Sequence, residues 1–95
     1  MKSFQASLEF GLKIKELRQK EGLTSTEFIQ ALKDKVDLKI TTGYITYIEL
    51  YRTIPHPRII KKFAQFFDID PAILFDIVKR IKIDAATMRI NRKYR

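Results

Sequence analysis

The side chains that usually carry covalent or metal chemistry are scarce in this sequence. Cysteine is absent and His56 is the single histidine, which excludes thiol catalysis, zinc bound through cysteine and any site that needs two histidines. His56 lies between two prolines, and we expect it to be an exposed loop or cap residue. No pair among four carboxylates suggests acid–base catalysis, because no neighbouring histidine, Lys–Ser or metal pattern supports them, and we interpret them as solvent-facing helix residues: Glu9, Glu16, Glu21 and Asp68. We therefore expect no enzyme activity, no cofactor and no metal site.

Positive charge is the strongest chemical feature of the chain. The 95 residues include 19 lysines and arginines against 11 aspartates and glutamates, which gives a formal net charge of +8. Residues 79–95 hold seven of these cations and one anion, Asp84, so this segment contributes +6 and the other residues contribute +2. Such a segment is attracted to polyanions, of which nucleic acid and an anionic membrane surface are the candidates.

Hydrophobic residues recur at helical spacing, and the glycines and prolines are interpreted as helix boundaries. Phe10, Ile14 and Leu17 predict a helix from Leu8 to Glu21, and Gly22 is the left-handed residue expected after it. No apolar run approaches the length of a membrane span, and residues 1–4 lack the apolar stretch of a signal peptide. We therefore expect a cytoplasmic protein without a membrane segment.

The starts of the later helices are marked by capping residues. Thr24 to Glu27 has the pattern of a capping box, and Thr41 is a good N-cap for a helix with a buried stripe at Ile45 and Ile48. Proline suits the first turn of a helix, so we place the next two starts at Pro57 and at Pro71, after Asp70. Residues 33–39 leave two interpretations open, a longer second helix or a loop. No alternating strand pattern is present, and the predicted class is all-α.

Several of these residues together form a family pattern. The matching residues are Leu17-Arg18, Gly22-Leu23-Thr24, Thr41, Tyr44-Ile45-Thr46, Ile48-Glu49, Pro55, Ala64 and Ile69-Asp70. This pattern resembles the helix-turn-helix domain of the Cro/C1 repressor type, the Xre family. The resemblance implies an all-α, five-helix, lambda-repressor-like bundle over residues 7–78, with residues 79–95 as a basic C-terminal helical extension.

The resemblance also implies how the domain would meet double-stranded DNA. The helix over 24–32 would lie across the phosphate backbone, and the helix over 41–51 would enter the major groove. The implied base-contact candidates are Thr41, Thr42, Gly43, Thr46 and Tyr47. The phosphate-contact candidates are Thr24, Ser25, Tyr44, Arg52, Arg58, Arg89, Arg92 and Lys93. Arg18 and Glu49 match a pair that forms a structural salt bridge in repressors of this type.

Two features differ from the family pattern. Residues 33–38 look like an insertion of six residues where the family usually has a tight turn. The helix over 41–51 contains no Arg, Lys, Asn or Gln, the side chains that form bidentate contacts with guanine and adenine. Sequence readout would then depend on Tyr and Thr or on DNA shape.

The predicted function is a sequence-specific DNA-binding transcription regulator, a small bacterial, phage or mobile-element repressor that binds as a homodimer and is nucleoid-associated when bound. The alternative is a protein-interaction module with the same fold, such as an antitoxin or a regulator that sequesters a protein partner. Residues 79–95 could contact phosphates, form a dimerisation helix or remain a solvated tail, and we favour the first two together. Phe66 or Phe67 is a candidate for a dimer contact, because three aromatic residues in five cannot all face the core.

Overall fold

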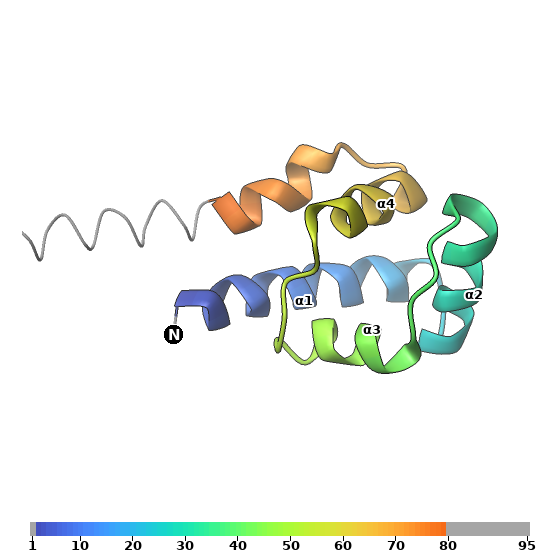
Figure 1. Cartoon of the computed structure of the whole chain (residues 1–95), viewed down its shortest axis with the longest axis horizontal. Helices are drawn as coiled ribbons and strands as arrows, with labels where there is room; N and C mark the ends of the chain where they lie inside the picture. The colour runs from blue at the N-terminus through green and yellow to red at the C-terminus, as the bar shows by residue number, and fades with distance from the viewer. Residues whose placement is uncertain (1, 80–95) are drawn as a thin grey trace, which may run out of the picture.

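The computed structural model describes residues 2–79, with side chains from residue 7 onward, and every regular element in that range is a helix (Figure 1). The helices are α1 (Lys2–Lys20), α2 (Ser25–Val36), α3 (Thr42–Glu49) and α4 (Pro57–Phe67), followed by a fifth helical segment over 71–79. The predicted all-α, five-helix class is confirmed. The first helix begins at Lys2 and not at Leu8 as predicted, because nothing between Ser3 and Ser7 breaks a helix. The predicted helix within 79–95 falls almost wholly outside the described residues.

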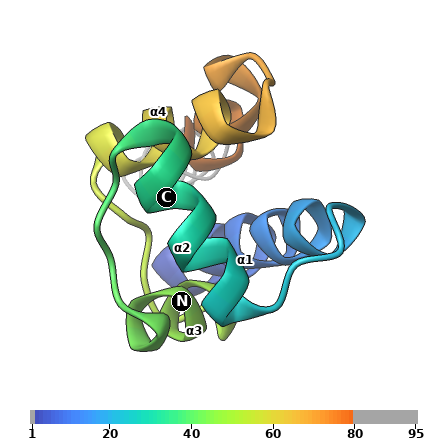
Figure 2. The same cartoon turned by 90° about the vertical axis from the view of Figure 1, so that its right-hand side faces the viewer.

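The helices pack so that α3 and α4 lie on different sides of α1. In Figures 1 and 2, α3 runs along one edge of the bundle, α1 lies in the middle, and α4 with the 71–79 segment lies on the other side. Helix α2 crosses one end of the bundle and contacts both α3 and α4, while α1 contacts α3. The position of α3 is therefore fixed by two neighbours, α1 and α2.

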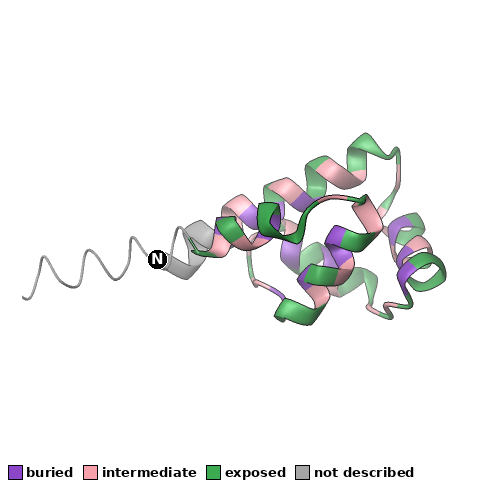
Figure 3. Ribbon diagram, turned by 90° about the horizontal axis from the view of Figure 1, so that it is seen from above, coloured by how far each residue is buried: buried purple, intermediate pink, exposed green. Residues whose placement is uncertain are grey.

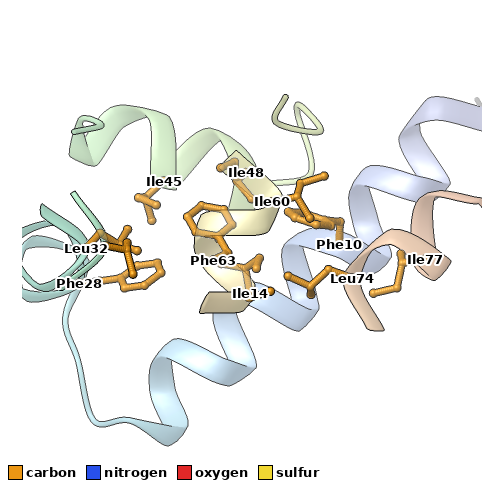
Figure 4. Packing of buried hydrophobic residues seen from close by; sticks show 12 residues of the cluster. Phe10, Ile14, Phe28, Leu32, Ile45, Ile48, Ile60, Phe63, Leu74 and Ile77 are labelled. Carbon is orange, nitrogen blue, oxygen red and sulfur yellow. The ribbon is translucent and has the colours of Figure 1, made fainter. Parts of the chain in front are cut away.

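The hydrophobic core is built from the apolar stripes of all five helical segments. Phe63 of α4 lies at its centre, between side chains from α1, α2 and α3 (Figure 4). The largest fully buried side chains are Phe10, Ile14, Phe28, Leu32, Ile45, Ile48, Ile60, Phe63 and Leu74. Buried residues lie on the sides of the helices that face one another and exposed residues on the outer sides (Figure 3), as expected for amphipathic helices.

The aromatic residues at the end of α4 extend this core. The rings of Phe66 and Phe67 are both half-buried, and each centroid lies 5.4 Å from that of Phe28. The ammonium group of Lys35 lies 5.3 Å from the centre of the Phe66 ring. Both phenylalanines thus have partners within the same chain, and their role in a dimer contact stays a prediction.

The predicted helix caps are confirmed. In the capping box, the Thr24 amide donates to Glu27 Oε1 at 2.9 Å and the Glu27 amide donates to Thr24 Oγ1 at 3.2 Å. Thr41 Oγ1 accepts from the Tyr44 amide at 3.1 Å. The Asp70 carboxylate accepts from the Ala72 amide at 2.9 Å, and His56 caps α4 by accepting from the Arg58 amide at 3.1 Å.

The capping box makes part of the stability dependent on pH. The hydrogen bonds with Thr24, first of all the one donated by its backbone amide, lower the pKa of Glu27 below its usual range. A lowered pKa in the folded state stabilises the fold at pH values above the ordinary glutamate pKa of about 4.3. This contribution is lost as the pH falls through the lower pKa of the folded state.

Replacement of Glu27 by glutamine tests this dependence, because glutamine can still accept the hydrogen bond from the Thr24 amide but carries no charge. We therefore expect wild type to lose more stability than Glu27→Gln between about pH 6 and pH 3 in urea unfolding. A constant difference between the two proteins across this range would contradict the prediction.

The segment 33–38, open in the sequence, is mostly helix. α2 continues to Val36, which is buried one turn beyond Leu32. Asp37 then takes a left-handed conformation with φ of 54°, and the Leu38 amide donates to the Leu32 carbonyl at 3.2 Å. Lys62 of α4 donates to the Val36 carbonyl at 2.8 Å. The insertion therefore forms one further turn of α2, which is held in place by a buried valine and by a hydrogen bond from another helix.

The prediction of a helix over 41–51 is wrong at its end, because α3 stops at Glu49. Tyr51 has a φ of 65°, the left-handed conformation that ends a helix and that glycine adopts most easily. The Arg52 amide then donates to the Tyr47 carbonyl at 2.9 Å and closes the last turn.

The interpretation of glycines as helix boundaries holds for Gly22, with φ of 72°, but is wrong for Gly11 and Gly43, which lie inside α1 and α3. At Gly11 the two helices cross so closely that an added Cβ would lie 2.3 Å from the Ile48 carbonyl oxygen. Glycine is therefore needed at position 11 for helix packing.

Candidate nucleic-acid interface

Helix α3 has one side anchored in the core and one side turned to solvent. Ile45 and Ile48 are fully buried, while the opposite side exposes residues that recur at intervals of three and four. We call this set the outer face of α3; it consists of Thr42, Gly43, Thr46, Tyr47 and Leu50. Because Leu50 follows the last helical residue, the outer face includes the C-cap of the helix.

The outer face of α3 forms part of a shallow, open hollow in the surface. The hollow is lined by Thr41, Thr42, Gly43, Tyr44, Thr46, Tyr47, Leu50 and Arg52. All five base-contact candidates from the sequence therefore share one surface, together with two of the phosphate-contact candidates, Tyr44 and Arg52. Their roles in DNA contact stay predictions.

The sequence reasoning did not identify Leu50 as part of this surface. Its side chain is 54% exposed and that of Tyr47 is 56% exposed, so two large side chains project from the same end of α3. The sequence does contain a signal for it, because Leu50 lies three residues after Tyr47 and four after Thr46, which is the spacing of residues on one helix face.

The hydroxyl groups of the hollow differ in what remains available to a ligand. Thr46 donates its hydroxyl proton to the Thr42 carbonyl at 3.0 Å. Thr41 Oγ1 already accepts from the Tyr44 amide as the N-cap. Among the described residues, no hydrogen bond engages the hydroxyls of Thr42 and Tyr47, so these two side chains are the freest polar groups on the outer face of α3.

The phosphate-contact candidates other than Tyr44 and Arg52 lie away from the hollow or outside the described residues. Thr24 is exposed and caps α2, and Ser25 is the half-buried first residue of that helix. Arg58 is exposed in the first turn of α4, and it is not among the residues that line the hollow. Three candidates, Arg89, Arg92 and Lys93, lie outside the described residues.

Arg18 of α1 and Glu49 at the end of α3 form a bidentate ion pair. Arg18 Nε donates to Glu49 Oε2 at 2.8 Å and Nη2 donates to Oε1 at 2.9 Å. Nη1 donates to the Leu23 carbonyl at 2.7 Å, so one guanidinium ties α3 to the loop before α2. The side chains are only 12% and 10% exposed. The hydrogen bond to Glu49 raises the pKa of Arg18 above its already high value, and the arginine therefore stays charged.

Two other classes of site are absent from the described residues. Between residues 2 and 79, no group of three histidine, aspartate or glutamate side chains could hold a metal ion. Over the same range, no helix combines the length and the apolar character needed to cross a membrane.

Comparison with known proteins gives one match. A protein-family model described as helix-turn-helix matches residues 14–74, well over half of the chain, from the middle of α1 into the 71–79 segment. No match is found among curated proteins or among solved structures.

Proposed function

The chain belongs to the helix-turn-helix family of the Cro/C1 type, the Xre family, whose members bind DNA, and from this premise we propose that it is a sequence-specific transcription repressor. In this proposal α3 lies in the major groove and α2 crosses the phosphate backbone. The protein acts without enzyme activity, and it works in the cytoplasm, associated with the nucleoid when bound.

The observation that carries the proposal is the division of α3 into a buried side and an open side. Ile45 and Ile48 fix the inner side in the core, and the Arg18–Glu49 ion pair fixes its end. The outer face of α3 is covered by no other described part of the chain, and the major groove is about 12 Å wide, enough to admit one helix. A rigid helix with one free face can present the same side chains to every binding site.

We propose that the binding unit is a homodimer. A helix of eight residues is about 12 Å long, so a single α3 spans only a few base pairs. Two copies that read half-sites one helical turn apart, about 34 Å, would double the recognised sequence. In this scheme residues 7–78 form the DNA-binding domain, and residues 79–95 supply dimer contacts and phosphate contacts.

The second candidate function is a protein-interaction module, such as an antitoxin or a regulator that sequesters a partner. The exposure of Tyr47 and Leu50 side by side favours it, because large apolar side chains in the open are typical of protein contacts. The helix-turn-helix match favours DNA, and we keep the repressor as the conclusion.

Selection of duplexes from a random pool tests the repressor. We expect enrichment of one sequence, and we expect Tyr47→Ala to reduce the preference for it about 5- to 150-fold, the usual range for one base-reading side chain. Gln19→Ala, on an exposed part of α1 away from the hollow, is the control and should bind as wild type.

Replacing both Arg92 and Lys93 by alanine should weaken the binding of all duplexes alike. It should also reduce the salt dependence of the affinity by the amount expected for about two phosphate contacts.

Two outcomes would count against the repressor. If no duplex is enriched and every affinity depends on salt alone, the sequence-specific part is wrong. If the protein binds no duplex at low salt and co-purifies with a partner, the interaction module is the better description.

A further inference from the structure

We propose that the outer face of α3 reads the C5-methyl groups of thymine, so that the half-site opposite α3 is rich in A·T pairs. This inference rests on the proposed function, since it names the bases that α3 would contact in the major groove. Thymine is the base that presents an apolar group there, while guanine, cytosine and adenine present only donors and acceptors.

The first argument is the chemistry that α3 lacks. No residue from Thr42 to Glu49 is Arg, Lys, Asn or Gln, so the helix has no bidentate partner for guanine or adenine. Its one charged residue, Glu49, is held by Arg18 at 2.8 Å and is turned away from the groove-facing side. The cation of the hollow is Arg52, which follows the helix and suits a phosphate at the edge of the contact.

The second argument is the orientation of Thr46. Its hydroxyl donates to the Thr42 carbonyl at 3.0 Å, so its proton is already engaged within the helix and its oxygen lone pairs are what it offers to a base. The side chain is exposed, and its methyl group is the other substituent of Cβ. Together with Leu50 and the ring of Tyr47, this methyl makes the outer face of α3 largely apolar. A cytosine amino group or guanine carbonyl pressed against these apolar groups would lose water, and only the hydroxyls of Thr42 and Tyr47 could replace the lost hydrogen bonds.

The third argument is Gly43. Glycine inside a helix costs stability relative to alanine, yet nothing in the fold requires it here. A Cβ at this position would meet only Thr41 Oγ1, at 3.8 Å, which is an ordinary contact. Helix packing explains why position 11 is glycine, but no contact within the protein explains why position 43 is glycine. A missing side chain on the outer face of α3 leaves room for a base edge to approach the backbone.

The test replaces thymine by deoxyuridine, one position at a time, in the duplex obtained by selection. This change removes one methyl group and keeps every hydrogen-bonding group of the base. We expect affinity to fall about fourfold for each methyl that α3 contacts, the effect of one buried methyl group. Positions outside the contact serve as internal controls and should show no change.

Two variants assign the contact to named residues. Thr46→Ser keeps the hydroxyl that binds the Thr42 carbonyl and removes only the methyl. At the one base position that this methyl contacts, the variant should bind the thymine duplex and the deoxyuridine duplex with equal affinity. Thr26→Ser, the same change on an exposed residue of α2, should keep the full discrimination. Gly43→Ala should melt at the same or a higher temperature while it binds the selected duplex at least about tenfold more weakly.

The outcomes separate this inference from the function on which it rests. Equal affinity for thymine and deoxyuridine at every position, or a G·C-rich site opposite α3, would overturn the inference that α3 contacts thymine methyl groups. Neither result would contradict the proposed repressor function. Wild-type affinity in Gly43→Ala would also overturn the inference. If selection enriches no duplex at all, the repressor itself fails and the inference fails with it.

Discussion

Replacement of Glu49 by alanine is expected to lower the free energy of unfolding by about 3 kcal/mol, at the lower end of the range for one half of a buried ion pair. The variant leaves the Arg18 guanidinium, which is only 12% exposed, without the carboxylate that accepts its two hydrogen bonds. For a domain of this size the midpoint of thermal unfolding should fall by about 15 °C. Urea unfolding at neutral pH measures the change directly.

Two further variants separate the loss of the pair from the loss of a side chain. Glu49→Gln keeps the shape and one acceptor, so it should cost less than alanine. The double replacement of Arg18 by methionine and Glu49 by leucine removes both charges, and we expect it to recover most of the stability, because no buried charge is left unpaired. A loss below about 1 kcal/mol in Glu49→Ala would show that the pair behaves like an exposed one.

Replacement of Gly11 by alanine is expected to lower the free energy of unfolding by about 1–3 kcal/mol, although alanine is the better helix former. The added Cβ would lie 2.3 Å from the Ile48 carbonyl oxygen and 2.9 Å from Cδ1 of Tyr51. The first of these neighbours is backbone, so relief requires α1 and α3 to move apart. Thermal unfolding followed by circular dichroism measures the effect, and valine at this position should be worse than alanine.

Gly43→Ala is the matched control for this prediction. Both glycines lie within helices, but a Cβ at position 43 would meet only Thr41 Oγ1, at 3.8 Å, which is an ordinary contact. We therefore expect opposite effects on stability from the same chemical change, a loss at position 11 and no loss or a gain at position 43. Equal stability of the two variants would show that α1 and α3 do not cross as closely as described.

The larger importance of Gly11 is for the position of α3. The crossing of α1 and α3 and the Arg18–Glu49 ion pair hold the same end of α3. Displacement of that end would move the outer face of α3 as a unit. We expect Gly11→Ala, at a temperature where it is still folded, to bind the selected duplex more weakly than wild type.

Much of this protein is predictable from residues within a turn of one another. The capping box at Thr24, the N-cap at Thr41 and the proline at the start of α4 depend on local hydrogen bonds and on a fixed φ, so the sequence identifies them directly. The apolar spacing likewise identified Phe10, Ile14, Ile45 and Ile48 as core, since helical periodicity is a local property. The family pattern then identified the helix-turn-helix family, and it predicted that α2 and α3 form the DNA-binding pair.

Other features depend on residues that are distant in the sequence. The last turn of α2 is capped by Lys62, 26 residues after the Val36 carbonyl that it binds. The need for glycine at position 11 comes from the backbone of α3, and no local pattern distinguishes it from a boundary glycine. The end of α3 is a third case, because Tyr51 takes a left-handed conformation without being glycine and its ring lies against Gly11 of α1.

The sequence by itself thus determined the helices, their caps, the core and the family. Only the tertiary structure decided how closely α1 and α3 approach, where α3 ends and which side chains share its outer face. The physical reason is the range of the forces involved. Hydrogen bonds at helix ends act between neighbours along the chain, whereas helix crossings and surface hollows exist only after distant segments have packed together.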